Sequence, residues 1–230
     1  MAEGVFDFYA YLMGGLSAEP QEALPYEPLE FPTSTPNVGG LRKLSFYADW
    51  TTMSSESPWS FKRQTYSSAG ERWRAMLELA PMSRQQAGLW QGFLLNLQGG
   101  YQSFLFGDVF NPEPMGSVLG TPRVNGAGQS GRTLVTDGWT ANSWGLLLAG
   151  DRFQIGTGYH QVTRNVNSDA SGNATLDIFP ALRTAPVDNL ILTTSAAKGV
   201  FALANPIQML SEITLRGIYS GISFEIVEAV

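Results

Sequence analysis

Residues 120–200 constrain the fold most, because they carry a series of turn signals with short apolar segments between them. The sequence DASGN at residues 169–173 is a strong hairpin turn, since Asp, Asn and Gly favour the backbone conformations of tight turns. The candidate strands are residues 131–136, 145–148, 152–155, 160–164, 174–179 and 189–194. Short strands at this spacing predict a small closed or nearly closed β-barrel.

The residues on either side of this barrel predict one body that the barrel interrupts. Residues 59–66 and 72–79 have strand-like patterns around a turn at residues 67–70. In the second strand, every other residue is apolar and would lie on one face: Trp73, Ala75, Leu77 and Leu79. Residues 223–227 alternate as a strand that rejoins the first sheet.

Residues 83–98 predict a helix within this body. Ser83 is a candidate N-cap, and Gln86 lies three residues later, as in a capping box. Gly99 and Gly100 end the helix. The apolar residues recur at steps of three and four: Ala87, Trp90, Phe93, Leu94 and Leu97. The sequence therefore predicts a mainly β fold with one helix and an inserted barrel, divided into residues 1–41, residues 42–119 with 201–230, and residues 120–200.

Residues 1–41 predict an extended arm, because five prolines interrupt both helix and central strand there. The segment holds six acidic residues and no Lys or Arg, and it is too aromatic for a solvated tail. We expect the arm to lie either on its own body or on a neighbouring subunit. An interface with a basic stretch at residues 59–84 would be complementary in charge. The candidate inter-subunit residues are Phe6, Phe8, Tyr9 and Tyr11 in the arm and Arg72 and Arg74 in the body.

Composition excludes several classes of site. The chain has no cysteine and one histidine, so thiolate metal sites and sites with two histidines are excluded. A net charge of −6 argues against binding the phosphate backbone of nucleic acid as the main activity. No apolar run is long enough to cross a membrane, and the N-terminus lacks the basic region of a secretory signal. We expect no cofactor, no metal ion and a cytoplasm-like compartment of synthesis.

A few residues carry alternative readings that involve chemistry or ligands. A carboxylate pair such as Asp151 and Asp177 would suit a glycosidase, although Asp is also favoured in turns such as the one at Asp151. The sequence shows no catalytic or metal-binding partner for His160, and no nucleophile-elbow motif is present. A histidine on the surface of a strand is therefore favoured. Trp139 and Trp144 could stack on a sugar, but aromatic anchors of a core or interface are the favoured interpretation. We predict no catalytic residue.

The order of several phrases resembles the distal tail and tail-tip minor tail proteins of siphophages and prophages. These phrases are the run WRAMLEL at residues 73–79, the helix SRQQAGLWQGFLLNLQGG and the strand-turn FLFGDVFNPEPMG. They continue with GTPRVNGAGQSG, AGDRFQIG, DASGNATLDIFPALR and FALANP. The resemblance covers about residues 42–206, and residues 1–41 do not match it.

The resemblance implies an architecture and a function. A β-sandwich-like ring domain would assemble, as a hexamer, around the DNA channel of the tail, with a galectin-, OB- or SH3-like barrel outside. The ring would connect the tail tube to the hub and the receptor-binding apparatus of the virion, after assembly in the host cytoplasm. DNA would pass through the lumen without specific binding, and no membrane partner is implied. The alternative is a carbohydrate-binding module at the tail tip that contacts the host surface through the inserted barrel.

Overall fold

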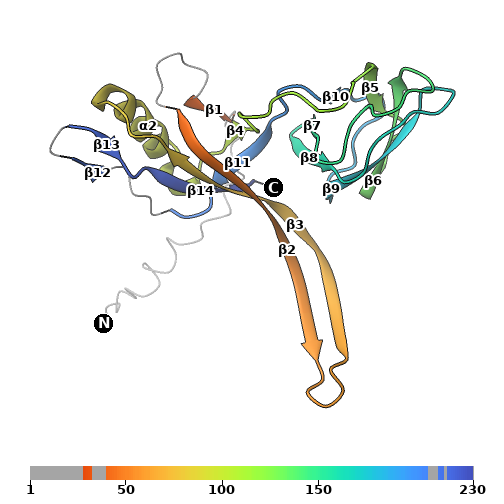
Figure 1. Ribbon diagram of the computed structural model, residues 1–230, viewed down its shortest axis with the longest axis horizontal. Coiled ribbons are helices and arrows are strands. Elements are labelled where there is room, and N and C mark those ends of the chain that lie inside the picture. The colour runs from red at the N-terminus through yellow and green to blue at the C-terminus, as the bar shows by residue number, and fades with distance from the viewer. Residues whose placement is uncertain (1–27, 33–39, 207–211, 215–216, 230) are drawn as a thin grey trace, which may run out of the picture.

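The computed structural model describes residues 28–32, 40–206, 212–214 and 217–229. It is mainly β, as the sequence predicted. Among the described residues, α2 (Arg84–Asn96) is the one α-helix. Figure 1 shows two bodies side by side, one with the helix and one built from strands alone, and a long hairpin that projects away from both. The N-terminal arm predicted for residues 1–41 lies mostly outside the described residues.

The first body is a six-stranded sheet, here called the body sheet. Its strands, in spatial order, are β1 (Leu29–Glu30), β4 (Phe104–Phe106), β11 (Gly199–Leu203), β14 (Ser223–Glu228), β3 (Arg63–Leu79) and β2 (Leu41–Glu56). The pair β1–β4 is parallel, and the other pairs are antiparallel. The C-terminal strand β14 lies between β11 and β3, so it rejoins the first sheet as the sequence predicted. A two-stranded sheet, β12 (Glu212–Ile213) and β13 (Tyr219–Ser220), lies beside it.

The core of the body is aromatic and lies between the sheet and α2. Ala87, Trp90, Leu94 and Leu97 are buried, which confirms the predicted apolar face of the helix. The predicted capping box is also present, with the Ser83 N–H donating to Gln86 Oε1 over 3.1 Å. Phe31, from the short described part of the N-terminal segment, is buried with its ring 5.2 Å from that of Trp90. This part of the segment therefore packs on its own body.

The second body is the barrel, which the chain builds between β4 and β11. Its strands, in spatial order, are β10 (Leu192–Thr193), β7 (Arg152–Ile155), β8 (Gly158–Val162), β9 (Ala174–Leu182), β6 (Gly131–Trp139) and β5 (Gly120–Val124). The two edges approach each other, because Val124 N–H donates to the Leu190 carbonyl and Asn189 N–H donates to the Val124 carbonyl, both over 2.9 Å. The barrel is therefore nearly closed. Its separate core includes Leu134, Phe153 and Leu176.

The barrel strands follow the sequence expectation with three exceptions. Of the candidate strand at residues 189–194, only Leu192–Thr193 is a strand, β10. Residues 145–148 form no strand; Leu147 makes only an isolated bridge with Val166. Strand β5 was not among the candidates, because GTPRV contains Gly and Pro and lacks an apolar run. The predicted turn at residues 169–173 is confirmed, since the Asp169 carboxylate accepts the N–H groups of Ser171 and Asn173 over 2.8 Å each.

The predicted turn at residues 67–70 is wrong. Strand β3 runs through these residues and pairs with β2, and the actual turn lies at residues 57–62. The register shifts between the pairs Trp50–Glu71 and Thr52–Ser67, so the Ser- and Gly-rich sequence is an irregularity inside a strand. Gly70 fits because a Cβ there would approach Thr51 Oγ1 to 2.7 Å. Such residues mark bulges as well as turns.

Candidate interaction surface

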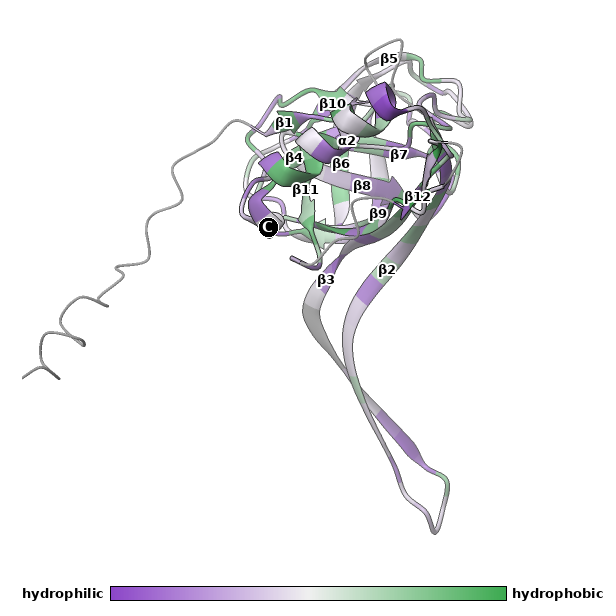
Figure 2. Ribbon diagram, turned by 90° about the vertical axis from the view of Figure 1, so that its left-hand side faces the viewer, coloured by the Kyte–Doolittle hydropathy of each residue, from purple (hydrophilic) through white to green (hydrophobic). Residues whose placement is uncertain are grey.

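The most unusual feature of the molecule is the distal hairpin, residues 51–66. All of its residues are exposed except Ser57, which is half-buried, so neither face of this ribbon packs on the other residues that the structure describes. Figure 2 shows the two strands leaving the body as an isolated ribbon. A two-stranded hairpin is marginally stable in water without a third strand or a packed face. The distal hairpin thus lacks the packing that normally holds such an element in place.

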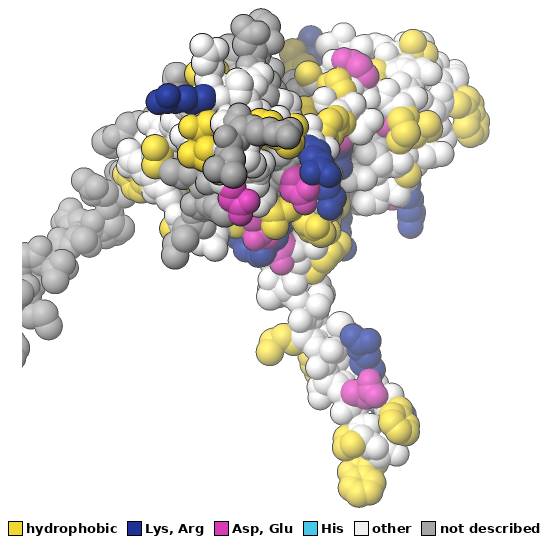
Figure 3. All heavy atoms as spheres, turned by 60° about the vertical axis from the view of Figure 1, so that its left-hand side comes forward, with side chains coloured by type: hydrophobic (Ala, Val, Ile, Leu, Met, Phe, Trp, Pro, Cys, Tyr) yellow, Lys and Arg dark blue, Asp and Glu magenta, His cyan; other side chains and the backbone are white. Residues whose placement is uncertain are grey.

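The end of the distal hairpin carries large apolar side chains. Trp59 is 94% exposed and Phe61 is 77% exposed, and Met53 and Tyr66 behind them are 74% and 66% exposed. The turn is closed by Ser57 N–H donating to the Lys62 carbonyl over 3.0 Å and by Phe61 N–H donating to the Ser57 carbonyl over 2.9 Å. Figure 3 shows the apolar side chains gathered at the end of the hairpin, with charged side chains just behind them.

Phe61 has a backbone φ of +54°, in the left-handed region that bulky residues rarely adopt. A glycine would relieve the strain, so the sequence keeps an aromatic ring at a position where the backbone alone does not favour it. The turn residues 57–62, here called the hairpin tip, therefore present Trp59 and Phe61 on a defined backbone.

Strand β3 also joins the body sheet to the barrel. The Glu71 carboxylate is 4% exposed; it accepts the Ala181 N–H and pairs with Arg132 over 2.6 Å, and both partners belong to the barrel. Two residues on, Trp73 Nε1–H donates to the Tyr159 carbonyl of β8 over 3.1 Å. The strand that carries the distal hairpin is thus fixed to the barrel at the base of the hairpin.

A second set of polar contacts lies at the end of β14. Glu228 Oε2 accepts both the Trp73 N–H and a guanidinium N–H of Arg183, each over 3.1 Å. Burial raises the pKa of Glu228, although these hydrogen bonds oppose the shift. Nearby, burial lowers the pKa of His160 to about 4, and its Nδ1 lies 2.8 Å from the Pro180 carbonyl oxygen. His160 was expected on a strand surface; it is instead 6% exposed and neutral at physiological pH.

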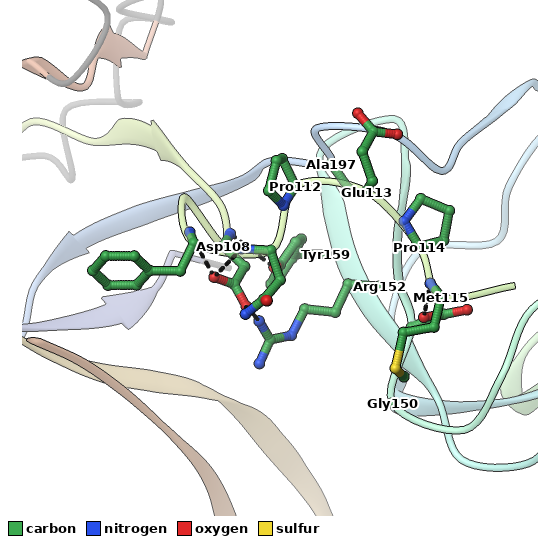
Figure 4. Close-up of a pocket in the computed structure, with 12 residues that line it drawn as sticks. Asp108, Pro112, Glu113, Pro114, Met115, Gly150, Arg152, Tyr159 and Ala197 are labelled. Atoms are coloured by element: carbon green, nitrogen blue, oxygen red, sulfur yellow. Dashed lines mark hydrogen bonds and ion pairs between the residues drawn. The ribbon is translucent and has the colours of Figure 1, made fainter.

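Between the two bodies lies a cavity of about 540 Å³, here called the intersheet pocket. Figure 4 shows Asp108 and Arg152 paired on one side of it, and Pro112, Pro114 and Met115 on the connecting loop along its other side. The Tyr159 hydroxyl accepts the Asp108 N–H over 3.2 Å, and burial raises the pKa of Tyr159 to about 12. The Arg152 guanidinium also lies 4.2 Å from the ring centroid of Phe46.

The two predicted inter-subunit arginines are partnered within the chain. Asp49 Oδ2 accepts from Arg72 Nε over 3.0 Å and from Arg74 Nη2 over 3.1 Å, and Arg74 Nη1 donates to Glu225 over 3.1 Å. The hydrogen bond from Arg72 lowers the pKa of Asp49. Their side chains are 42% and 37% exposed, so contact with another chain would add to these pairs. The other candidates, Phe6, Phe8, Tyr9 and Tyr11, lie outside the described residues.

The two tryptophans proposed as a glycan platform are not alike. Trp139 is 5% exposed in the barrel core, and its Nε1–H donates to Thr136 Oγ1 over 2.8 Å, so it cannot stack on a sugar. The sequence grouped it with Trp144 because the two tryptophans flank the same turn at residues 140–142, and sequence spacing does not reveal which side chain points inward. Trp144 is 82% exposed.

The carboxylates considered for a glycosidase pair have structural partners. Asp151 accepts the backbone N–H groups of Met115, Gly116 and Leu148 over 2.7 to 2.9 Å, which fixes the loop that lines the intersheet pocket. Asp177 pairs with Arg164 over 3.4 Å at the barrel surface. Within the part of the chain that the structure describes, no group of three His, Cys, Asp or Glu side chains could hold a metal ion.

No protein-family model matches the chain, and no curated protein matches it in sequence. The described segments also contain no helix with the length and apolar character that crossing a membrane requires. The distal hairpin and the resemblance of the sequence phrases are therefore the features that point to a function.

Proposed function

We propose that this protein is a structural subunit of a bacteriophage tail tip and that its copies assemble into a ring around the DNA channel. The ring would connect the tail tube to the hub and receptor-binding proteins, with DNA passing through the lumen unbound. The resemblance of the sequence phrases suggests six copies and supplies the place in the virion.

The distal hairpin is the observation that carries this proposal. It projects from the molecule, neither of its faces has a packing partner among the described residues, and it ends in exposed aromatic side chains. Projecting apolar surface of this kind marks interaction sites in soluble proteins. A subunit whose role is assembly needs such an element, whereas an enzyme acting alone does not. The carboxylates that could have supported an enzyme instead hold loops and surface ion pairs.

Light scattering after size exclusion, with negative-stain images of the peak, tests the proposal. We expect closed particles of about six copies with a central hole, as cyclic symmetry gives. Replacing both tip aromatics, Trp59→Ser with Phe61→Ser, should shift the equilibrium toward the monomer. Trp144→Ser is the matched control, because it removes another highly exposed tryptophan, from the barrel. A wild-type chain that stays monomeric at every concentration, alone and with tail extracts, would refute the proposal.

Trp144 keeps a second function open, a carbohydrate-binding barrel on the outside of the ring. An exposed indole on a barrel loop is the kind of surface on which sugar rings stack. A glycan array should then show a signal that Trp144→Ala abolishes and Trp59→Ser leaves unchanged. No signal, or a signal indifferent to Trp144, would remove this function.

A further inference from the structure

The hairpin tip presents aromatic rings, and the intersheet pocket presents apolar groups on which such rings pack. The tip is a narrow knob that presents two aromatic rings, Trp59 and Phe61. The pocket has the volume of cavities that bury aromatic ligands. Its open side exposes apolar groups of the kind that pack on aromatic rings, since Phe110 is 53% exposed and Met115 is 66% exposed.

Charge distinguishes the intersheet pocket from two smaller cavities among the described residues. Behind the tip rings lie Lys62 and Arg63, opposed only by Glu56, so this end of the hairpin is basic. The intersheet pocket is lined by three carboxylates and one guanidinium, and one of these carboxylates, Glu113, is exposed at its rim. One of the two smaller cavities is lined by a balanced Arg183–Glu228 pair and neutral His160. The other is lined by two arginines and one aspartate. Of these three cavities, the intersheet pocket has the excess of carboxylates that attracts a basic tip.

The distal hairpin is long enough to reach another copy. From Trp50, which contacts Phe179 of the barrel at a ring distance of 4.6 Å, strand β2 continues to Glu56. At a rise of about 3.4 Å per residue, these six steps extend roughly 20 Å from the base of the hairpin. Because the ribbon points away from both bodies (Figure 1), the tip does not return to the pocket of its own chain.

We propose that the hairpin tip of one copy docks in the intersheet pocket of the next copy. This inference rests on the proposed ring and names the two surfaces that form it. The hairpin tip and the intersheet pocket lie on different parts of one chain, so the contact is heterologous and repeats head to tail. Such a contact closes into a ring when the rotation between copies divides the circle, and otherwise makes an open filament.

The absence of cysteine from the whole chain gives a direct test by crosslinking. In the double variant Ser60→Cys with Met115→Cys, one thiol lies in the tip between the two aromatic residues and the other lines the pocket. A short bismaleimide should link successive copies, and a denaturing gel should show a ladder of covalent multimers. In the control variant Ser60→Cys with Trp144→Cys, the second thiol replaces a side chain more exposed than Met115, and we expect no ladder. Mixing the two single variants should give dimers alone.

The outcomes separate the docking inference from the ring itself. Rings in the electron microscope without a ladder, or with equal ladders in both double variants, would overturn the docking contact and leave the ring in place. No rings and no ladder would overturn both. Sedimentation of the chain with phosphatidylglycerol vesicles, lost in Trp59→Ser and without a ladder, would assign the tip to a lipid surface instead.

Charge reversal supplies an independent test with exposed residues alone. Reversing the tip, Lys62→Glu with Arg63→Glu, should raise the concentration at which the oligomer dissociates on the order of tenfold, and so should Glu113→Lys at the pocket rim. Combining the three changes should restore assembly, because the charges are again opposite. If the oligomer of the combined variant is weakened by as much as the two separate effects added together, the tip and the pocket do not contact each other.

Discussion

His160 gives the sharpest prediction about stability, because its burial is nearly complete and its charge state is defined. The ring stacks on Phe153 with centroids 5.7 Å apart, and Nδ1–H donates to the Pro180 carbonyl. Burial lowers the pKa of the imidazole from 6.5 to about 4. The neutral form is therefore favoured in the folded state, and the unfolded chain binds a proton more readily at every pH between these two values.

The sign and size of the effect follow from this difference. The stabilisation by His160 is fully present above pH 6.5 and is lost as the pH falls toward 4. A difference of 2.5 pKa units corresponds to about 3 kcal/mol of unfolding free energy at 1.36 kcal/mol per unit. His160→Asn is the matched variant, because its amide can still donate to the Pro180 carbonyl and does not ionise.

Urea unfolding followed by circular dichroism at pH 7.5, 5.5 and 4 measures this effect. The difference in unfolding free energy between wild type and His160→Asn should change by about 3 kcal/mol from pH 7.5 to pH 4, with the wild type losing more. Glu228, whose raised pKa has the opposite dependence, is present in both chains and cancels. Parallel pH curves for the two proteins would show that His160 is hydrated in the folded state and would refute the reasoning.

Two further predictions concern the pocket loop and the glycines. Asp151→Ala should leave three backbone N–H groups without their acceptor, including that of Met115, and lower the unfolding free energy by about 2–4 kcal/mol. Hydrogen exchange should become faster at the Met115 amide first, and unchanged protection of that amide would contradict this prediction. Gly88→Ala should raise the melting temperature, because a Cβ in α2 meets nothing within 4 Å and alanine favours the helix by about 1 kcal/mol. Gly116→Ala should lower it, because its Cβ would lie 2.4 Å from the Leu146 carbonyl oxygen; equal melting temperatures would refute the contrast.

The elements that the sequence predicted well are those where local pattern and tertiary environment agree. The helix at Arg84–Asn96 has the predicted capping box and periodic apolar face, although it ends two residues before the predicted boundary and Gln98–Gly100 form a short 3₁₀ helix. Strand β7 was predicted with its full range, and the alternation of Trp73, Ala75, Leu77 and Leu79 matches a buried face. Consistent signals of this kind are typical of segments whose packing supports their local preference.

The distal hairpin could not be predicted from such local signals. Its strands have no buried face, so hydrophobic alternation, the main signal for a strand, carries no information there. Two Ser-rich segments compete for the turn, SPWS at residues 57–60 and SSAG at residues 67–70, and the second contains the glycine. Only the pairing of Asp49 with Arg72 and of Trp50 with Glu71 decides between them, and these pairings depend on the register of the whole sheet.

The intersheet pocket could not be predicted from the sequence for a related reason. Asp108 and Arg152 come from segments 44 residues apart, and nothing in either segment marks the other as its partner. Asp151 appeared as a turn residue, which is correct, but the N–H groups it accepts include two from a loop 35 and 36 residues earlier in the chain. A carboxylate that accepts three backbone bonds and one that could take part in hydrolysis have the same sequence signature.

Strand β3 links these observations into one expectation about assembly. Its distal half forms the hairpin, Glu71 and Trp73 bond to the barrel, and Ala75 and Leu77 are buried in the core of the body. One continuous strand therefore connects the hairpin tip to the hydrogen bonds that hold the barrel. If the tip docks on a neighbouring copy, we expect slower hydrogen exchange at Ala181, whose N–H bonds to Glu71, in the assembled state than in the monomer. Protection confined to the hairpin would mean that the irregularity between residues 67 and 71 isolates the tip from the barrel.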